Sequence, residues 1–295
     1  MTCLSINAFK GCVNLTTVYY NGTEREEGVV KLPEGVTTIE SGAFSGCESV
    51  KSIVLPAGIT EIGTSAFAGC ANLESIYTAG EQAKVGTVKW PNVIKDIPAS
   101  VVEGCAKITE FALPENVENL GERFINGTGI TEFTVPGTIE SLNIGVFDGN
   151  MSLKKVTLEK GLGSLYIPGE YESPKAGTFS GCENLETIVI NADLTVIPAL
   201  TFRYCHNLKT VNIPDTVTEI GSNAFDECTS LTELFIPKSV ISISSGQFNK
   251  WNETQTIKFE ASAANVARTC NNFSGAWVTV NLNVLFNQER TTAKA

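Results

Sequence analysis

Nine cysteines and one histidine are the residues of this 295-residue chain that could hold a metal or supply a nucleophile and its base. Seven of the cysteines recur at one position of a repeating pattern: Cys12, Cys47, Cys70, Cys105, Cys182, Cys205 and Cys228. No Cys-x-x-Cys pair occurs, whereas zinc sites use Cys and His ligands at short spacings. His206 stands at a position where other copies carry Glu, Ala or Thr. We therefore predict no metal ligands and no catalytic residue, and we interpret His206 as a surface residue.

The fixed position of the cysteines predicts buried thiols rather than disulfides. Equivalent side chains in adjacent copies would lie about 4.8 Å apart and point the same way. A disulfide needs β-carbons about 3.8 Å apart and turned toward each other. Only Cys3 and Cys270 fall outside the repeated position, near opposite ends of the chain. We expect all nine cysteines to be free.

Two other patterns could be mistaken for ligand sites. The segment Gly161-x-Gly163 lacks the third glycine and the following helix of a dinucleotide-binding loop, so we expect no cofactor. Phenylalanine recurs at a second fixed position, mostly after Ala or Thr: Phe9, Phe44, Phe67, Phe124, Phe147, Phe179, Phe202, Phe225 and Phe248. Recurrence at a fixed phase indicates core packing rather than an aromatic binding stripe.

The composition excludes one class of partner and leaves the compartment open. The net charge is −11, and nucleic-acid binding without sequence preference depends on Lys and Arg, so we predict no nucleic-acid partner. No run of 18 apolar residues could span a membrane, and residues 1–9 lack the basic start and apolar stretch of a signal peptide. An intracellular protein and a portion of a longer exported protein both fit these observations.

The elements that carry these residues are short and repeat with a period of 23 residues, since Phe225 and Cys228 map onto Phe202 and Cys205. A fixed period of this length indicates a solenoid, in which each copy is too small to bury its own apolar face. Within a copy, Leu-x-x-Ile-x-Leu-Pro predicts a short strand that ends at Pro, because Pro cannot donate a ladder hydrogen bond. Val-x-x-Ile-Gly predicts a second extended stretch, and Ala-Phe-x-x-Cys a helical or 3₁₀ turn.

The landmarks resemble the BspA-like leucine-rich repeat family, whose unit has the form Leu-x-x-Ile-x-Ile-Pro-x-x-Val-x-x-Ile-Gly-x-x-Ala-Phe-x-x-Cys. The match is best over residues 208–228 and 50–70. The resemblance implies a mainly β, right-handed solenoid of stacked short parallel strands. It also implies a surface or secreted adhesin-like interaction module without catalytic residues.

Departures from the period define the expected domain organisation. We predict a solenoid of about ten copies over 1–259, a C-terminal cap over 260–286 and a tail over 287–295. Cys12 to Cys47 and Cys70 to Cys105 are both 35 residues apart, which reveals two matched insertions near 20–33 and 78–91. Each is predicted to be a hairpin, since Asn21-Gly22 is a tight-turn signal. A third insertion near 167–176 has the composition of a surface loop.

We predict a non-enzymatic scaffold that binds a protein or a surface glycan through the exposed strand positions of its concave face and through the two hairpins. The expected binding residues are Tyr19, Tyr20, Tyr77, Trp90, Glu24, Glu26, Glu27, Val54 and Phe235. Aromatic side chains supply rigid contact area, and the glutamates favour a basic partner. Hairpins that merely lengthen the sheet and bury Trp90 are the alternative. A structural component of a filament or lattice is the second functional hypothesis, and the truncated first copy predicts self-association through its unpaired N-terminal edge.

Overall fold

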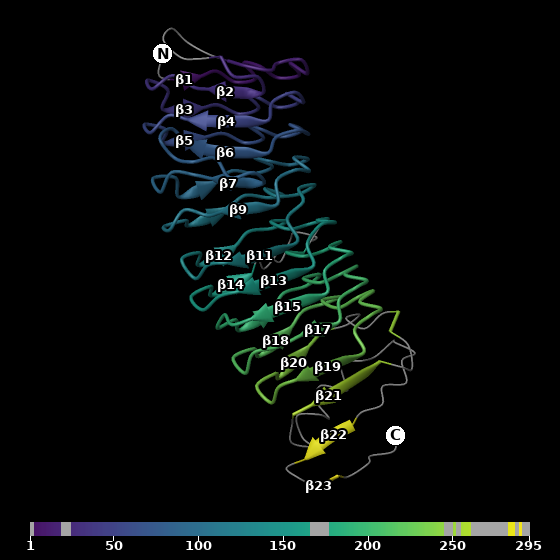
Figure 1. Ribbon diagram of the computed structural model, residues 1–295. Coiled ribbons are helices and arrows are strands. Elements are labelled where there is room, and N and C mark those ends of the chain that lie inside the picture. Colours follow the sequence, from purple (N-terminus) through teal and green to yellow (C-terminus); the bar gives the residue numbers. More distant parts are fainter. Residues whose placement is uncertain are drawn as a thin grey trace. The chain divides into compact units, whose positions relative to one another are not determined.

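The computed structural model describes residues 3–18, 25–165, 177–244, 250–251, 255–260, 283–286 and 289–290. The chain divides into two compact units, Met1–Thr131 and Glu132–Ala295, which are described separately. Both are stacks of short strands in parallel sheets (Figure 1). The predicted fold class, a mainly β repeat solenoid, is thereby confirmed. We call the chain segment formed by one copy of the repeat a coil.

The described residues of the first unit form three parallel sheets. One contains, in spatial order, β2 (Val29–Lys31), β4 (Ser52–Leu55), β6 (Ser75–Thr78), β7 (Thr87–Lys89) and β9 (Glu110–Ala112). A second contains β1 (Cys3–Leu4), β3 (Thr38–Ile39) and β5 (Glu61–Ile62). The third pairs β8 (Asp96–Ile97) with β10 (Asn119–Leu120). The Leu-x-x-Ile-x-Leu stretches supply most strands of the first sheet, and the Val-x-x-Ile stretches form the other two.

The second unit repeats this arrangement. Its first sheet contains β11 (Glu132–Val135), β13 (Lys155–Leu158), β15 (Thr187–Ile190) and β17 (Thr210–Val211). A further sheet contains β19 (Glu233–Ile236), β21 (Thr256–Phe259), β22 (Asn283–Phe286) and β23 (Glu289–Arg290), the last pair being antiparallel. The Val-x-x-Ile stretches form β12 (Ser141–Leu142) with β14 (Ser164–Leu165), and β16 (Val196–Ile197) with β18 (Glu219–Ile220) and β20 (Ser242–Ile243).

The Ala-Phe-x-x-Cys stretch forms successive tight turns, and the expected helical or 3₁₀ turn is wrong for the described coils. Left-handed residues interrupt the segment, as at Gly42 (φ 66°) and Gly46 (φ 74°), and a right-handed helix cannot pass through them. Many of its N–H groups point to the next coil instead, and the Phe44 N–H donates to the Ala66 carbonyl over 2.8 Å. The Cα of Gly46 would lie 3.6 Å from a Cβ placed on Gly69, so the corners of adjacent coils approach closely.

The phenylalanines pack inside each stack, as predicted. In the second unit Phe147, Phe179, Phe202 and Phe225 are buried, and successive ring centroids lie 5.2, 5.6 and 5.4 Å apart. Burial of this aromatic column supplies much of the apolar contact that a single coil cannot make. Phe248 lies outside the described residues.

The cysteines lie beside this column, and the eight that the structure describes have free thiols. The Cys205 Sγ donates to the Phe179 carbonyl of the preceding coil over 3.1 Å, and Cys228 repeats the contact with Phe202 over 3.2 Å. Burial raises the pKa of Cys47 to about 11 and that of Cys182 to about 12, so both are neutral thiols. Cys12, in the first coil, is exposed, and Cys270 lies outside the described residues.

The coil after Cys228 carries Trp251 at the cysteine position. Its indole N–H donates to the Phe225 carbonyl over 3.1 Å, which replaces the thiol contact with an equivalent one. The predicted cap, tail and 167–176 loop lie mostly outside the described residues and stay predictions.

Candidate functional site

The two matched insertions do not form hairpins, which corrects the prediction from Asn21-Gly22. β7 pairs with β6 in parallel, with Ser75 opposite Thr87 and Ile76 opposite Val88. A hairpin would pair antiparallel, but the chain first returns along residues 79–86 to the start of β6. There the Gly86 N–H donates to the Glu74 carbonyl over 2.7 Å. In the first insertion Val18 likewise bridges Val30 in parallel, so each insertion adds one strand to one sheet.

Trp90 is a core residue, so its assignment as a binding residue is wrong; its burial agrees with the alternative interpretation, although the insertion is not a hairpin. It is 2 % exposed, and its ring lies 6.5 Å from Phe67 and 5.8 Å from Phe111. The coil that follows has Val102 at the phenylalanine position. Trp90 and Phe111 fill the place of the missing ring, and Phe111 continues to Phe124 at 5.5 Å.

Val54 is also removed from the candidate set, because it is only 9 % exposed. It stands in register between Lys31 on β2 and Tyr77 on β6, whose longer side chains flank it. Sequence alternation alone places Val54 on the outer face of β4 but says nothing of how its neighbours cover it.

The remaining predicted residues are partly accessible. Tyr77 is half-buried, whereas Glu26 and Glu27 are exposed. The Glu26 carboxylate lies 3.4 Å from the Lys31 ammonium. In the second unit Phe235 on β19 is 40 % exposed. Tyr19, Tyr20 and Glu24 lie outside the described residues, so the structure does not test them.

The outer face of the strands in the second unit is open along two rows of side chains. The first row, in register across β11, β13, β15 and β17, is Glu132, Lys155, Thr187 and Thr210. The second, across β11, β13 and β15, is Thr134, Thr157 and Val189. The same two positions are Glu233 and Phe235 on β19 and Thr256 and Lys258 on β21. These side chains alternate with apolar ones such as Val156 and Ile188, which are buried.

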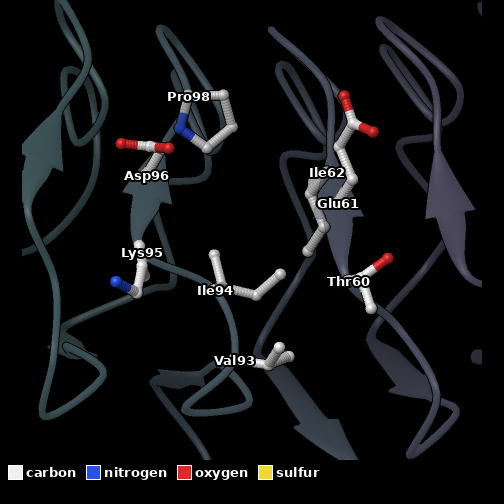
Figure 2. Close-up of a pocket in the computed structure, with 8 residues that line it drawn as sticks. All are labelled: Thr60, Glu61, Ile62, Val93, Ile94, Lys95, Asp96 and Pro98. Atoms are coloured by element: carbon white, nitrogen blue, oxygen red, sulfur yellow. The ribbon is translucent and has the colours of Figure 1, made fainter.

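A pocket of about 430 Å³ in the first unit was not predicted from the sequence. It lies between β5 and β8 (Figure 2) and is lined by Thr60, Glu61, Ile62, Val93, Ile94, Lys95, Asp96 and Pro98. The two strands are not paired with each other. Two signals could have revealed it: the insertion at 78–91 separates these strands in sequence, and Pro98 follows Ile97 where other coils carry Gly63 or Gly121.

The titratable side chains do not converge on a reaction centre in the described residues. His206 is half-exposed, with its Nε2 3.9 Å from the Glu227 carboxylate. No group of three Cys, His, Asp or Glu side chains suited to a metal ion is found within the described ranges. Nor does the described part of the chain contain a helix with the length and hydropathy needed to cross a lipid bilayer.

Stacked parallel strands, a buried aromatic column and in-phase thiols define a β-solenoid of the leucine-rich repeat class. The sequence matches the BspA type leucine-rich repeat region in six copies, over residues 1–78, 18–154 and 172–283. The chain belongs to the BspA type leucine-rich repeat family.

One solved leucine-rich repeat structure shares this fold, and two others are less similar. A leucine-rich repeat protein from Bacteroides ovatus is 18 % identical with a TM-score of 0.55, covering 97 % of this chain and 88 % of its own. The leucine-rich repeat protein of T. pallidum is 20 % identical with a TM-score of 0.44, over 69 % and 77 %. A leucine-rich cell surface protein from Faecalibacterium prausnitzii is 19 % identical with a TM-score of 0.38, over 84 % and 82 %. A search of the curated proteins gives no match.

Proposed function

We propose that the protein is a non-catalytic binding scaffold that recognises a protein partner through the outer strand face of its second unit. The observation that carries this proposal is the alternation of buried and exposed side chains along each strand. Buried positions are uniformly apolar, as at Val156, Ile188 and Leu234, and hold the coils together. The alternating exposed positions contribute nothing comparable to the core, so their chemistry is free to serve recognition.

The chemistry of this face suits a protein surface. Its threonines are short and branched, and they present hydroxyl groups at little conformational cost. Its charges are largely paired between strands, as with Lys258 and Glu233 at 2.5 Å, so a partner is not selected by net charge alone. Phe235 supplies an exposed aromatic anchor of the kind enriched in binding hot spots.

Site-specific photo-cross-linking tests the proposal. A benzophenone amino acid is placed at Thr210, on the outer face, and in a separate variant at Glu219, which is equally exposed but belongs to β18 in another sheet. In cells that make the protein, we expect a discrete adduct with one protein from position 210 and none from 219. Adding Phe235→Ala should reduce the adduct from position 210. Equal labelling from both positions, or indifference to Phe235→Ala, would contradict the proposal.

A further inference from the structure

The pocket in the first unit is a break in a hydrogen-bonded sheet. From β3 to β5 the Thr37 carbonyl accepts from the Glu61 N–H over 3.3 Å, and the Ile39 carbonyl accepts from the Gly63 N–H over 2.7 Å. From β8 to β10 the carbonyls of Lys95 and Ile97 accept in the same way. At β5 the equivalent acceptors are Thr60 and Ile62, and no hydrogen bond joins them to residues 95–98.

The matched first insertion shows why the break occurs here. Leu4 and Ile39 are separated by 35 residues, as are Ile62 and Ile97, yet β1 and β3 pair directly. That pairing uses the Glu40 N–H, which donates to the Leu4 carbonyl over 2.9 Å. The residue equivalent to Glu40 in the second case is Pro98, which has no N–H to donate. The Ile62 carbonyl therefore cannot receive its usual bond.

The gap at β5 and β8 combines an added strand in the neighbouring sheet with the missing N–H of Pro98. β7 inserts one strand between β6 and β9 in the neighbouring sheet and has no counterpart between β5 and β8. An added strand does not open the other sheet by itself, because β1 and β3 pair directly across the first insertion. At β5 and β8 the Pro98 N–H is missing as well, and the pocket of about 430 Å³ lies between these two strands. Because N–H and C=O groups of alternate residues point to opposite edges, Ile62 on β5 and Asp96 on β8 direct theirs into this gap.

The side chains around the gap define what would fit it. Glu61 and Asp96 are exposed and occupy equivalent positions on the two strands. Ile62 and Ile97, one residue later, are 6 % and 2 % exposed, and Ile94 extends into the space between the strands (Figure 2). A guest strand in register would place one residue between the two carboxylates and the next between the two isoleucines.

Lys95 is the one lysine among the residues that line the pocket, and it does not cancel the negative charge of Glu61 and Asp96. The Lys95 ammonium binds the Glu118 carboxylate over 2.5 Å, and this hydrogen bond raises the pKa of Lys95. Glu61 has no ion-pair partner among the described residues. Asp96 accepts a hydrogen bond from the Asn119 side-chain amide on β10 over 2.5 Å. A neutral amide does not offset the charge of the carboxylate, so the gap favours a positive charge at the position flanked by Glu61 and Asp96.

We propose that this pocket binds an extended peptide segment that completes the interrupted sheet and carries a basic residue followed by an apolar one. The guest donates two N–H groups, from the basic residue to the Thr60 carbonyl and from the residue after the apolar one to the Ile62 carbonyl. It runs parallel to β5 and β8, in the mode of strand addition. This site is separate from the outer strand face of the second unit and does not depend on it.

A defined peptide series tests the proposal on the full chain. The protein is titrated into the fluorescein-labelled peptide TTRVTT, and binding is followed by fluorescence anisotropy. Two control peptides are measured in the same way. One is TTEVTT, and the other is TTRVTT with N-methyl groups on the arginine and on the residue after valine. We expect both controls to bind at least about 10-fold more weakly, since one places like charges together and the other removes both donated N–H groups. Hydrogen exchange measured by mass spectrometry should slow at residues 60–63 and 95–98 when TTRVTT binds.

Charge reversal in the protein gives the complementary measurement. Glu61→Lys combined with Asp96→Lys should invert the preference, so that TTEVTT binds more tightly than TTRVTT. Glu48→Lys combined with Glu183→Lys makes the same net charge change at exposed positions outside the pocket and should leave the order unchanged. The proposal is overturned if TTRVTT fails to bind at about 1 mM, a weak affinity, or if the N-methylated peptide binds equally well. The proposal would also be overturned if a neutral disaccharide, in place of the peptide, slowed hydrogen exchange at residues 60–63.

Discussion

Replacing Trp90 tests how the second insertion is accommodated, because two opposing effects act on this one side chain. The indole fills the place of the phenylalanine that Val102 lacks, packed between Phe67 and Phe111. Its Nε1 is buried, however, and has no hydrogen-bond partner. Truncating a buried Trp to Ala costs about 3–5 kcal/mol, whereas a buried donor without a partner costs about 1–3 kcal/mol.

Trp90→Leu copies Leu32, the equivalent residue of the first insertion, and retains part of the apolar contact. It leaves a cavity but also removes the unpaired N–H, so we expect a net loss of about 1–3 kcal/mol of unfolding free energy. Trp90→Phe keeps an aromatic ring and removes the same N–H. We expect it to remain within about 1 kcal/mol of the parent protein.

Urea unfolding followed by circular dichroism measures both variants, and hydrogen exchange over residues 87–111 localises the effect. The order of the two variants is the decisive result. Both variants lack the indole N–H, so their order reports the aromatic ring alone. If Trp90→Phe were the more destabilising, an aromatic ring would not be what this place in the core requires and the reasoning would be refuted. Adding Val102→Phe to Trp90→Leu should recover part of the loss, because it restores the arrangement of Leu32 with Phe44.

Two further predictions concern the aromatic column and the thiols. Phe202→Ala should lower the unfolding free energy by about 3–5 kcal/mol in urea, since Phe202 is 0 % exposed between two rings; a loss under about 1 kcal/mol would contradict its role in the core. Burial raises the pKa of Cys182 from 9.0 to about 12, so its contribution to stability is present below pH 9 and is lost as the pH rises toward 12. The midpoint temperature of thermal unfolding should fall over that pH window, and it should fall less steeply for the Cys182→Ala variant. Parallel pH profiles of the midpoint for the two proteins would argue against a buried neutral thiol.

The sequence by itself determined the architecture. Landmarks that return every 23 residues must occupy equivalent places, because no single coil can bury its apolar side chains alone. The burial of Phe202, the thiol at Cys205 and the parallel strands all follow from that phase. The same phase identified the two matched insertions and the loss of the phenylalanine at Val102.

Only the tertiary structure decided what the insertions do. A tight-turn sequence such as Asn21-Gly22 is compatible with a hairpin, but the choice between antiparallel and parallel pairing depends on which strand the returning chain meets. Trp90 is buried because a neighbouring coil lacks a ring, a relation between residues far apart along the fold. The pocket at β5 and β8 forms where an inserted strand coincides with Pro98, which has no N–H with which to pair the two strands, whereas the Glu40 N–H pairs β3 with β1 across the first insertion.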